Sequence, residues 1–301
     1  MQETDFSVLP EGCITNILSF TSPRDACTSS LVSSTFKSAA DSDVVWEKFL
    51  PSDYKDIVSR SGSSLSLNGF PSRKDLYFRL CGEPVLLDGG NKTLNLEKNS
   101  GKKCFVIGAR ELEIHWGDSP QHWKWIPESD SRFGEVAELV GVCWLFVKGK
   151  IDTHTLSPKT TYVAYLVIRF TENAHGLDHP PADVCVEFAG QGNSAWASGT
   201  HSVYLDPECN RRPLVNFQPH RLGLVRRRYG HILRSALSNV RRYEGQFPID
   251  RKDGWMEIEM GEFYNDQGDD GEVTMTLKET NSGHWKGGLI VEGIELRPKM
   301  K

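Results

Sequence analysis

A change in hydrophobic period near residue 102 is the feature that most constrains the fold of this chain. From that point on, apolar and polar residues alternate in short segments, and turns such as Asp270-Gly271 and Ser282-Gly283 punctuate them. Many short strands without helical patterns between them indicate an antiparallel sandwich or barrel. The alternating segments are Phe105 to Ala109, Leu112 to Trp116, Trp255 to Met260, Val273 to Leu277 and Leu289 to Val291.

The first 50 residues have the pattern of short helices instead. The clearest helix start is Ser22, an N-cap serine followed by Pro23 at the first helical position and by the carboxylate of Asp25. About 45 residues bury too little apolar surface to be stable alone, so we expect this unit to need a partner. Its apolar positions are Leu9, Ile14, Ile17 and Leu18, then Leu31, Val32 and Phe36, then Val45, Trp46 and Phe49.

These patterns predict an α+β, multidomain chain. We expect a helical domain over residues 1–50, a mixed linker region over 51–100 and an all-β antiparallel sandwich over 101–301. Within the linker, the Ser- and Gly-rich stretch Ser59 to Gly69 predicts a flexible loop, and Lys74 to Leu80 a short helix or strand.

Charge and cysteine content bound the cellular setting. The net charge is −5 and the pI about 6.0, so the whole chain offers no basic footprint for nucleic acid or an anionic membrane. The acidic start lacks a signal-peptide pattern, and the longest apolar runs are only strand-sized. The seven cysteines include no C-x-x-C pair, which favours reduced thiols. We therefore expect a protein of the cytoplasm and nucleus that does not contact membranes.

The sequence contains no recognisable catalytic or cofactor motif. Gly190 to Ala195 loosely matches a dinucleotide-binding loop, but His201 to Leu205 follows as a strand and not as a helix, so a hairpin loop is the better interpretation. His175 and His179, near Cys185, could be metal ligands, but Gly176, Pro180 and Pro181 prevent the helix that would place both histidines on one face, so we expect a solvated loop. We expect a non-catalytic protein without metal or cofactor.

One segment has a charge opposite to that of the chain. Between Asp206 and Tyr243, nine arginines face only Asp206 and Glu208, which gives a local charge of about 9 − 2 = +7. We interpret the segment as a solvated insertion between strands. The alternative is a dock for an acidic partner or nucleic acid, although no aromatic platform accompanies the charge. The arginines are 211, 212, 221, 226, 227, 228, 234, 241 and 242.

Two parts of the chain resemble known families. The N-terminal part resembles an F-box through Leu9-Pro10, Ile14, Ile17 to Phe20, Ser22 to Ala26, Ser30 to Ser33, Phe36, Ala39 to Asp43 and Val45-Trp46. The C-terminal part resembles the plant phloem lectins, the family of the tobacco lectin Nictaba. That resemblance rests on Trp116 to Pro120, Trp123 to Trp125, Glu135 to Leu139, Gly149 to Ile151, Asp253 to Ile258, Gly261 to Phe263 and Asp270 to Val273.

The F-box resemblance implies a partner. F-boxes pack a helical hairpin onto the Skp-type adaptor of a Skp/cullin/F-box ubiquitin ligase, and such an interface needs a few buried apolar anchors. The contact candidates are Leu9, Pro10, Ile14, Ile17, Leu18, Leu31 and Val32. Some of them are expected to be internal core instead. Leu9 and Pro10 are favoured as contacts, while Leu31 and Val32 fit either role.

The lectin resemblance implies a jelly-roll-like domain with a sugar site. A pyranose ring has a C–H face that stacks on aromatic rings and hydroxyls that need a few polar groups. Trp116 and Trp123 match the two tryptophans through which this family binds N-acetylglucosamine oligomers and N-glycan cores, and Glu272 matches an acidic residue tied to sugar binding. Trp116 is also in phase with Leu112 and Ile114, so a core position is equally open. Trp125, Trp144 and Trp255 are expected in the core.

Together the resemblances imply the substrate receptor of a ubiquitin ligase, which binds the adaptor, and cullin through it, and reads glycosylated targets with its sandwich. Two alternatives remain. The sandwich recognises a protein degron without sugar, or the chain is a lectin that acts outside any ligase.

Overall fold

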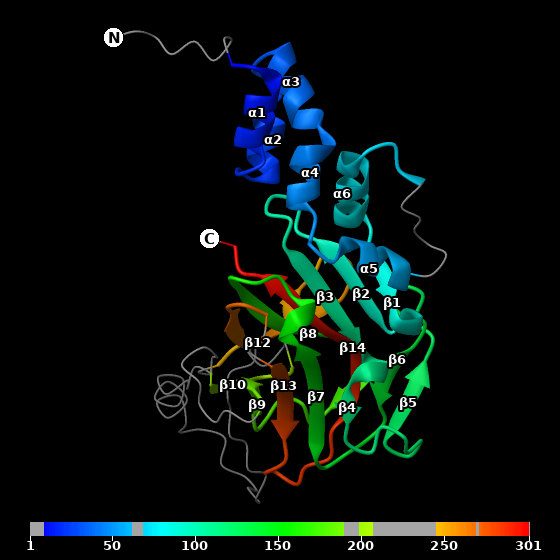
Figure 1. Cartoon of the computed structure of the whole chain (residues 1–301). Helices are drawn as coiled ribbons and strands as arrows, with labels where there is room; N and C mark the ends of the chain where they lie inside the picture. Colours follow the sequence, from blue (N-terminus) through cyan, green and yellow to red (C-terminus); the bar gives the residue numbers. More distant parts are fainter. Residues whose placement is uncertain (1–8, 62–68, 190–198, 207–244, 269–270, 301) are drawn as a thin grey trace, which may run out of the picture.

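The computed structural model describes residues 9–61, 69–189, 199–206, 245–268 and 271–300 (Figure 1). Six short helices come first, and an antiparallel two-sheet domain follows, which confirms the predicted fold class. The predicted loop at Ser59 to Gly69 lies largely outside the described residues, and Gly190 to Ala195 and the arginine-rich segment lie wholly outside them. The helices are α1 (Glu11–Leu18), α2 (Pro23–Ser29), α3 (Ser34–Asp41), α4 (Asp43–Phe49), α5 (Tyr54–Arg60) and α6 (Arg73–Gly82).

Trp46 on α4 organises the helical part. Its side chain is fully buried, and its indole N–H donates to the carbonyl of Ala40 at 2.7 Å. The rings of Phe49, Tyr77 and Phe78 lie 5.5, 5.1 and 5.3 Å from it between centroids. Because Tyr77 and Phe78 belong to α6, the helical unit extends past the predicted boundary at residue 50. The predicted cap is also present, since the Ser22 side chain accepts from the backbone N–H of Asp25 at 3.1 Å.

Two sheets follow, and their strand pairs are antiparallel. The larger sheet has the order β1-β2-β3-β14-β8-β12-β11, with β6 on β14 and β5 on β6; the smaller has the order β10-β9-β13-β7-β4. The strands are β1 (Val85–Leu87), β2 (Lys92–Leu96), β3 (Lys103–Gly108), β4 (Glu113–Ile114), β5 (Trp123–Ile126), β6 (Val136–Leu139), β7 (Leu145–Asp152), β8 (Thr160–His175), β9 (Ala182–Phe188), β10 (Thr200–Val203), β11 (Ile249–Asp250), β12 (Met256–Asn265), β13 (Glu272–Glu279) and β14 (Gly287–Pro298). Three 3-10 turns, Asp88–Gly90, Ala109–Glu111 and Thr153–Thr155, interrupt them.

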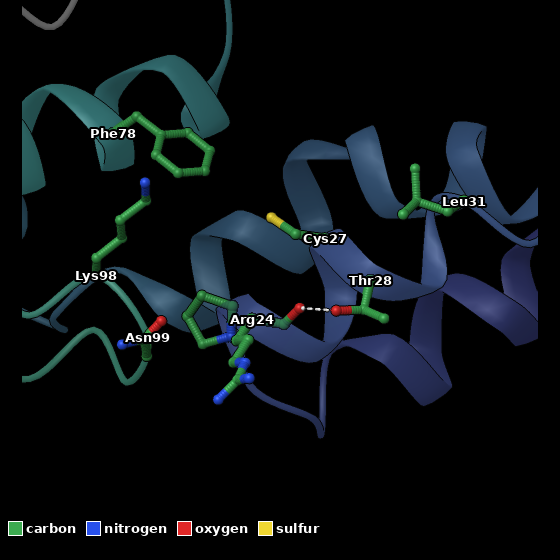
Figure 2. Close-up of a pocket in the computed structure, with 8 residues that line it drawn as sticks. Arg24, Cys27, Thr28, Leu31, Phe78, Lys98 and Asn99 are labelled. Atoms are coloured by element: carbon green, nitrogen blue, oxygen red, sulfur yellow. Dashed lines mark hydrogen bonds between the residues drawn. The ribbon is translucent and has the colours of Figure 1, made fainter. Parts of the chain in front are cut away.

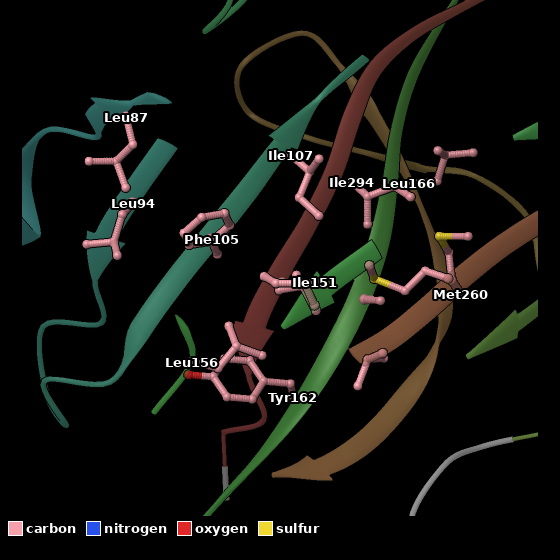
Figure 3. Packing of buried hydrophobic residues seen from close by; sticks show 14 of the residues in the cluster. Leu87, Leu94, Phe105, Ile107, Ile151, Leu156, Tyr162, Leu166, Met260 and Ile294 are labelled. Atoms are coloured by element: carbon pink, nitrogen blue, oxygen red, sulfur yellow. The ribbon is translucent and has the colours of Figure 1, made fainter. Parts of the chain in front are cut away.

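The sheets pack face to face through their inward side chains. A Cβ on Gly149 of β7 would lie 2.7 Å from Cδ1 of Ile294 on β14, so the two strands approach as closely as glycine allows. Phe188 of β9 meets Phe263 of β12 edge to face, with centroids 6.0 Å apart. Figure 3 shows part of this core, with Ile151 from the small sheet among side chains of the large one. The alternation of apolar residues thus reports burial between two layers.

The helices and the sandwich share one continuous core. The turn between β2 and β3 lies against the helices: the Tyr77 hydroxyl donates to the carbonyl of Lys98 at 3.0 Å. A Cβ on Gly101 would lie 2.7 Å from the carbonyl oxygen of Phe49, and Gly101 has φ +69°, so glycine is required there. Lys103 Nζ forms an ion pair with Asp53 at 2.7 Å. The region predicted as a linker therefore supplies α5, α6 and the sheet strands β1 and β2.

A buried charge network holds the loops that lead into β6 and β12. Glu295 on β14 binds Arg132 at 3.0 Å and Arg251 at 2.8 Å, and Arg251 also binds Asp253. The adjacent Trp255 is buried, and its indole N–H donates to the carbonyl of Asp130. The Asp253 to Ile258 motif is therefore structural here, and the predicted core position of Trp255 is confirmed.

This network predicts a loss of stability in acid. Burial alone would raise the pKa of Glu295, but the nearby Arg132, Arg251 and Arg297 outweigh it and hold that pKa below its ordinary value of 4.5. The carboxylate then contributes stability above its unfolded pKa and loses it as the pH falls through the folded pKa. We expect the melting temperature of the wild type to fall more steeply than that of Glu295→Gln between about pH 5 and pH 3. Parallel melting curves across that range would contradict this role.

No helix among the described residues is long and apolar enough to span a bilayer.

Candidate functional site

The indole-rich turn between β4 and β5 displays one tryptophan to solvent. Trp116 is 39% exposed and has φ +61°, a left-handed conformation that is unfavourable for a bulky residue. Such strain persists only where the surrounding structure imposes it, and it clusters at binding sites. The turn is closed by backbone hydrogen bonds from Gly117 to Ile114 and from Ser119 to Trp116, both 2.9 Å. Trp116 is therefore not a core residue, and the alternative prediction of a core position is wrong.

The other two indoles of the turn hold it in place. Trp123 is 2% exposed, and its N–H donates to the carbonyl of His115 at 3.2 Å. Trp125 is half-buried, donates to the carbonyl of Gly117 at 3.1 Å and stacks under the guanidinium of Arg110. The prediction that Trp123 offers a face to a ligand does not fit this placement, because the ring is enclosed. Trp123 and Trp125 instead fix the backbone on either side of Trp116.

Trp116 is part of a line of rings that we call the distal aromatic row: Trp144, His115, Trp116 and His122. The centroid distances along it are 5.6, 4.4 and 5.1 Å. Nδ1 of His122 lies 2.8 Å from the carbonyl oxygen of Gly141, which anchors that end. Trp144 is 49% exposed, so its predicted core position is wrong. It stands just before β7, where the chain has not yet entered the sheet.

A fourth exposed aromatic side chain adjoins the row. Trp285 is 60% exposed, and a Cβ on Gly141 would lie 3.6 Å from its ring. The next residue, Lys286, is buried and forms an ion pair with the buried carboxylate of Glu279. Lys286 Nζ also donates to the carbonyls of His284 at 2.8 Å and Cys143 at 3.2 Å. The pair thus ties the β13–β14 loop, which carries Trp285, to the segment that carries Trp144.

Glu272 lies at the other end of the small sheet. On β13 it pairs with Asp152, the last residue of β7. Trp116 comes two residues after Ile114, which pairs with Val147 near the start of β7. Glu279, opposite Leu145, marks the Trp116 end, and the separation of 279 − 272 = 7 positions corresponds to about 23 Å along a strand. The prediction that Glu272 joins Trp116 in one site is therefore not supported by the geometry. The exposed polar side chains on the Trp116 turn are Asp118 and Gln121.

The predicted adaptor contacts divide by burial. Leu31 is 85% exposed, Val32, Ile17 and Pro10 are exposed, and Leu9 is partly buried. Ile14 and Leu18 are almost fully buried inside the helical unit, so their assignment as contacts is wrong: the other face of α1 is the free one. Phe20 and Val44, which were not among the predicted contacts, are 82% and 61% exposed. Exposed apolar side chains concentrated in so small a unit mark an interaction surface.

Figure 1 places the helices at one end of the molecule and the β4–β5 and β13–β14 loops at the other. Six cysteines lie in the described ranges, and all are free thiols. Within those ranges, no group of three His, Cys, Asp or Glu side chains is arranged to hold a metal ion.

The arrangement defines a class: a helical unit with exposed apolar side chains, packed through a shared core onto a β-sandwich that exposes aromatic side chains at its far end. Comparison with known proteins gives the family. Residues 102–298 match the phloem protein 2 family and residues 6–48 match the F-box domain. The chain belongs to the phloem protein 2 family and is an F-box protein.

Several F-box proteins are similar to this chain over nearly its whole length. In Arabidopsis thaliana, F-box protein PP2-B15 is 43% identical over 97% of this chain and 96% of its own. F-box protein VBF is 41% identical over 97% and 99%, and F-box protein PP2-B10 is 40% identical over 99% and 95%. The F-box implies a Skp-type adaptor as the partner of the helical end.

Proposed function

We propose that this protein is the non-catalytic target-recognition subunit of a Skp/cullin/F-box ubiquitin ligase, acting in the cytoplasm and nucleus. Its helical end binds the adaptor, and its distal aromatic row binds N-acetylglucosamine-containing glycans on target proteins. The exposed Trp116, presented on a braced turn at the end opposite the F-box, is the observation that carries the proposal.

The chemistry of the row suits a sugar chain. Four aromatic rings in line offer stacking faces, and Asp118 and Gln121 on the same turn offer hydrogen bonds to hydroxyl groups. Each stacking contact contributes about 0.5 to 1.5 kcal/mol, so one or two contacts give only weak binding. Useful affinity then requires several sugar units, several copies of the glycan, or contacts with the protein beside it.

We expect Trp116→Ala to weaken binding of the full chain to chitin oligomers and N-glycans by about twofold to thirteenfold, because one stacking contact of about 0.5 to 1.5 kcal/mol is lost. A glycan array followed by calorimetry measures this, and circular dichroism checks the fold. Leu31→Asp is the matched control: it should weaken adaptor binding and leave the array pattern unchanged.

The alternatives have distinct signatures in the same experiment. Absence of glycan binding by the folded wild type, with adaptor binding intact, would favour a protein degron as the target. Glycan binding without any adaptor binding would favour a lectin that acts outside a ligase.

A further inference from the structure

A pocket of about 300 Å³ lies where the F-box helices meet the sandwich (Figure 2). Pro23, Arg24, Cys27, Thr28 and Leu31, from α2 and the residues after it, form one wall. Phe78 of α6 with Lys98 and Asn99 of the β2–β3 turn form the other. This volume is at the low end for ligand pockets and suits one or two side chains of a bound segment.

The pocket is apolar inside and positively charged at its rim. Phe78, Cys27, Pro23 and Leu31 supply apolar surface, and Lys98 Nζ lies 5.9 Å from the centre of the Phe78 ring. Neither Arg24 nor Lys98 forms an ion pair with any residue that the structure describes. Glu97, adjacent in the chain, accepts from the backbone N–H groups of Asn99 and Ser100 at 3.1 and 2.8 Å. The Glu97 carboxylate is therefore hydrogen-bonded within the turn and forms no ion pair with Lys98 among the described residues.

The wall that the β2–β3 turn contributes is fixed before anything binds. The Glu97 carboxylate closes the turn that carries Lys98 and Asn99, the Tyr77 hydroxyl donates to the Lys98 carbonyl, and Gly101 touches the backbone of α4. A preformed pocket loses little conformational entropy on binding.

We propose that this pocket receives an acidic segment of the Skp-type adaptor that carries an apolar side chain. Leu31 is both one of the exposed apolar residues of the F-box and part of the pocket wall, so an adaptor that contacts Leu31 lies at the edge of the pocket. Two unpaired cations at an apolar pocket complement a segment with carboxylates beside an apolar anchor. Through Lys98 and Asn99 the adaptor touches the β2–β3 turn, just ahead of the residues 102–298 that match the phloem protein 2 family, which makes this turn of the sandwich part of the adaptor interface. The inference rests on adaptor binding by the F-box and is independent of glycan binding.

The first test is charge reversal in the full chain. We expect Arg24→Glu with Lys98→Glu to raise the Kd for the purified adaptor about tenfold at low salt. The difference from the wild type should shrink at 0.5 M salt, where the Debye length is between about 3 and 8 Å and charges are more strongly screened. The matched control is Lys124→Glu with Lys278→Glu, two exposed lysines on β5 and β13 far from the helices. This control should leave the Kd within about twofold of the wild type, because charges far from the interface act only through weak long-range electrostatics.

The second test is independent of charge. Bound adaptor should slow alkylation of Cys27, followed by mass spectrometry, and leave Cys143 at the far end unaffected. An unchanged Kd in the double reversal, with Leu31→Asp still weakening binding, would overturn the proposal. An unchanged rate at Cys27 in the complex would do so as well. Loss of all adaptor binding in the wild type would refute the ligase assignment together with this inference.

Discussion

Replacing Lys286 with Met is expected to lower the free energy of unfolding by about 3 to 5 kcal/mol, the cost of leaving one member of a buried ion pair without its partner. Both side chains are almost completely enclosed. Burial alone would raise the pKa of Glu279, but its hydrogen bonds to Lys286 and Ser282 outweigh that effect and hold the pKa below its ordinary value. Without Lys286 the carboxylate must lose its charge or draw in water. Urea denaturation followed by circular dichroism measures the change.

Two comparisons separate the ion pair from a general loss of packing. Lys278→Met removes a charge from an exposed position on β13, beside Glu279, and should change the free energy of unfolding by less than about 0.5 kcal/mol. Adding Glu279→Leu to Lys286→Met removes both charges and should recover most of the loss, since an apolar pair can replace a buried ion pair. A loss in the single variant as small as that of Lys278→Met would show that the pair contributes little.

Trp46→Ala is expected to destabilise the helical unit by about 3 to 5 kcal/mol and to abolish adaptor binding. The substitution leaves a cavity between α4 and α6 and removes the donor to the buried carbonyl of Ala40. Thermal melting by circular dichroism, combined with adaptor pull-down, measures both effects.

Trp144→Ala is the matched control, because it removes the same side chain from an exposed position. It should change stability by less than about 0.5 kcal/mol and leave adaptor binding intact. If Trp46→Ala behaved in the same way, the assignment of Trp46 as the centre of the helical core would be wrong.

The period of the hydrophobic pattern was sufficient to predict the fold class, because burial on one face of a helix or strand leaves a direct trace in the sequence. The capping signals at Ser22 were equally local and equally readable. The role of residues 51–100 as helices and sheet strands could not be predicted from the hydrophobic pattern. β1 and β2 are short: β1 pairs with β2, and β2 joins the sheet by pairing with β3, a contact that periodicity within the segment does not encode.

The candidate site was predicted only in part, since sequence pattern does not say which face of a ring is free. Trp116 and Trp123 lie seven residues apart in similar surroundings, yet one is exposed and the other enclosed. The decisive difference is backbone conformation: the positive φ of Trp116 turns its ring outward. Trp285 left a readable signal, a large apolar residue two positions after Gly283 of the Ser282-Gly283 turn. Trp144 left none, because it lies within the apolar run Val142 to Val147, which favoured a core position.

The close fit of the β2–β3 turn against α4 and α6 has a consequence for how a target is modified. With Gly101 against the backbone of Phe49 and Lys103 paired with Asp53, the sandwich has little freedom to swing on the helices. In the proposed ligase the molecule then acts as a rigid spacer that fixes the distance and the angle between the adaptor and the target. Every target held at the far end stands in the same place relative to the ubiquitin-transfer machinery. Which of its lysines receives ubiquitin is decided by where the glycan is attached on the target surface, and not by the sequence around the lysine.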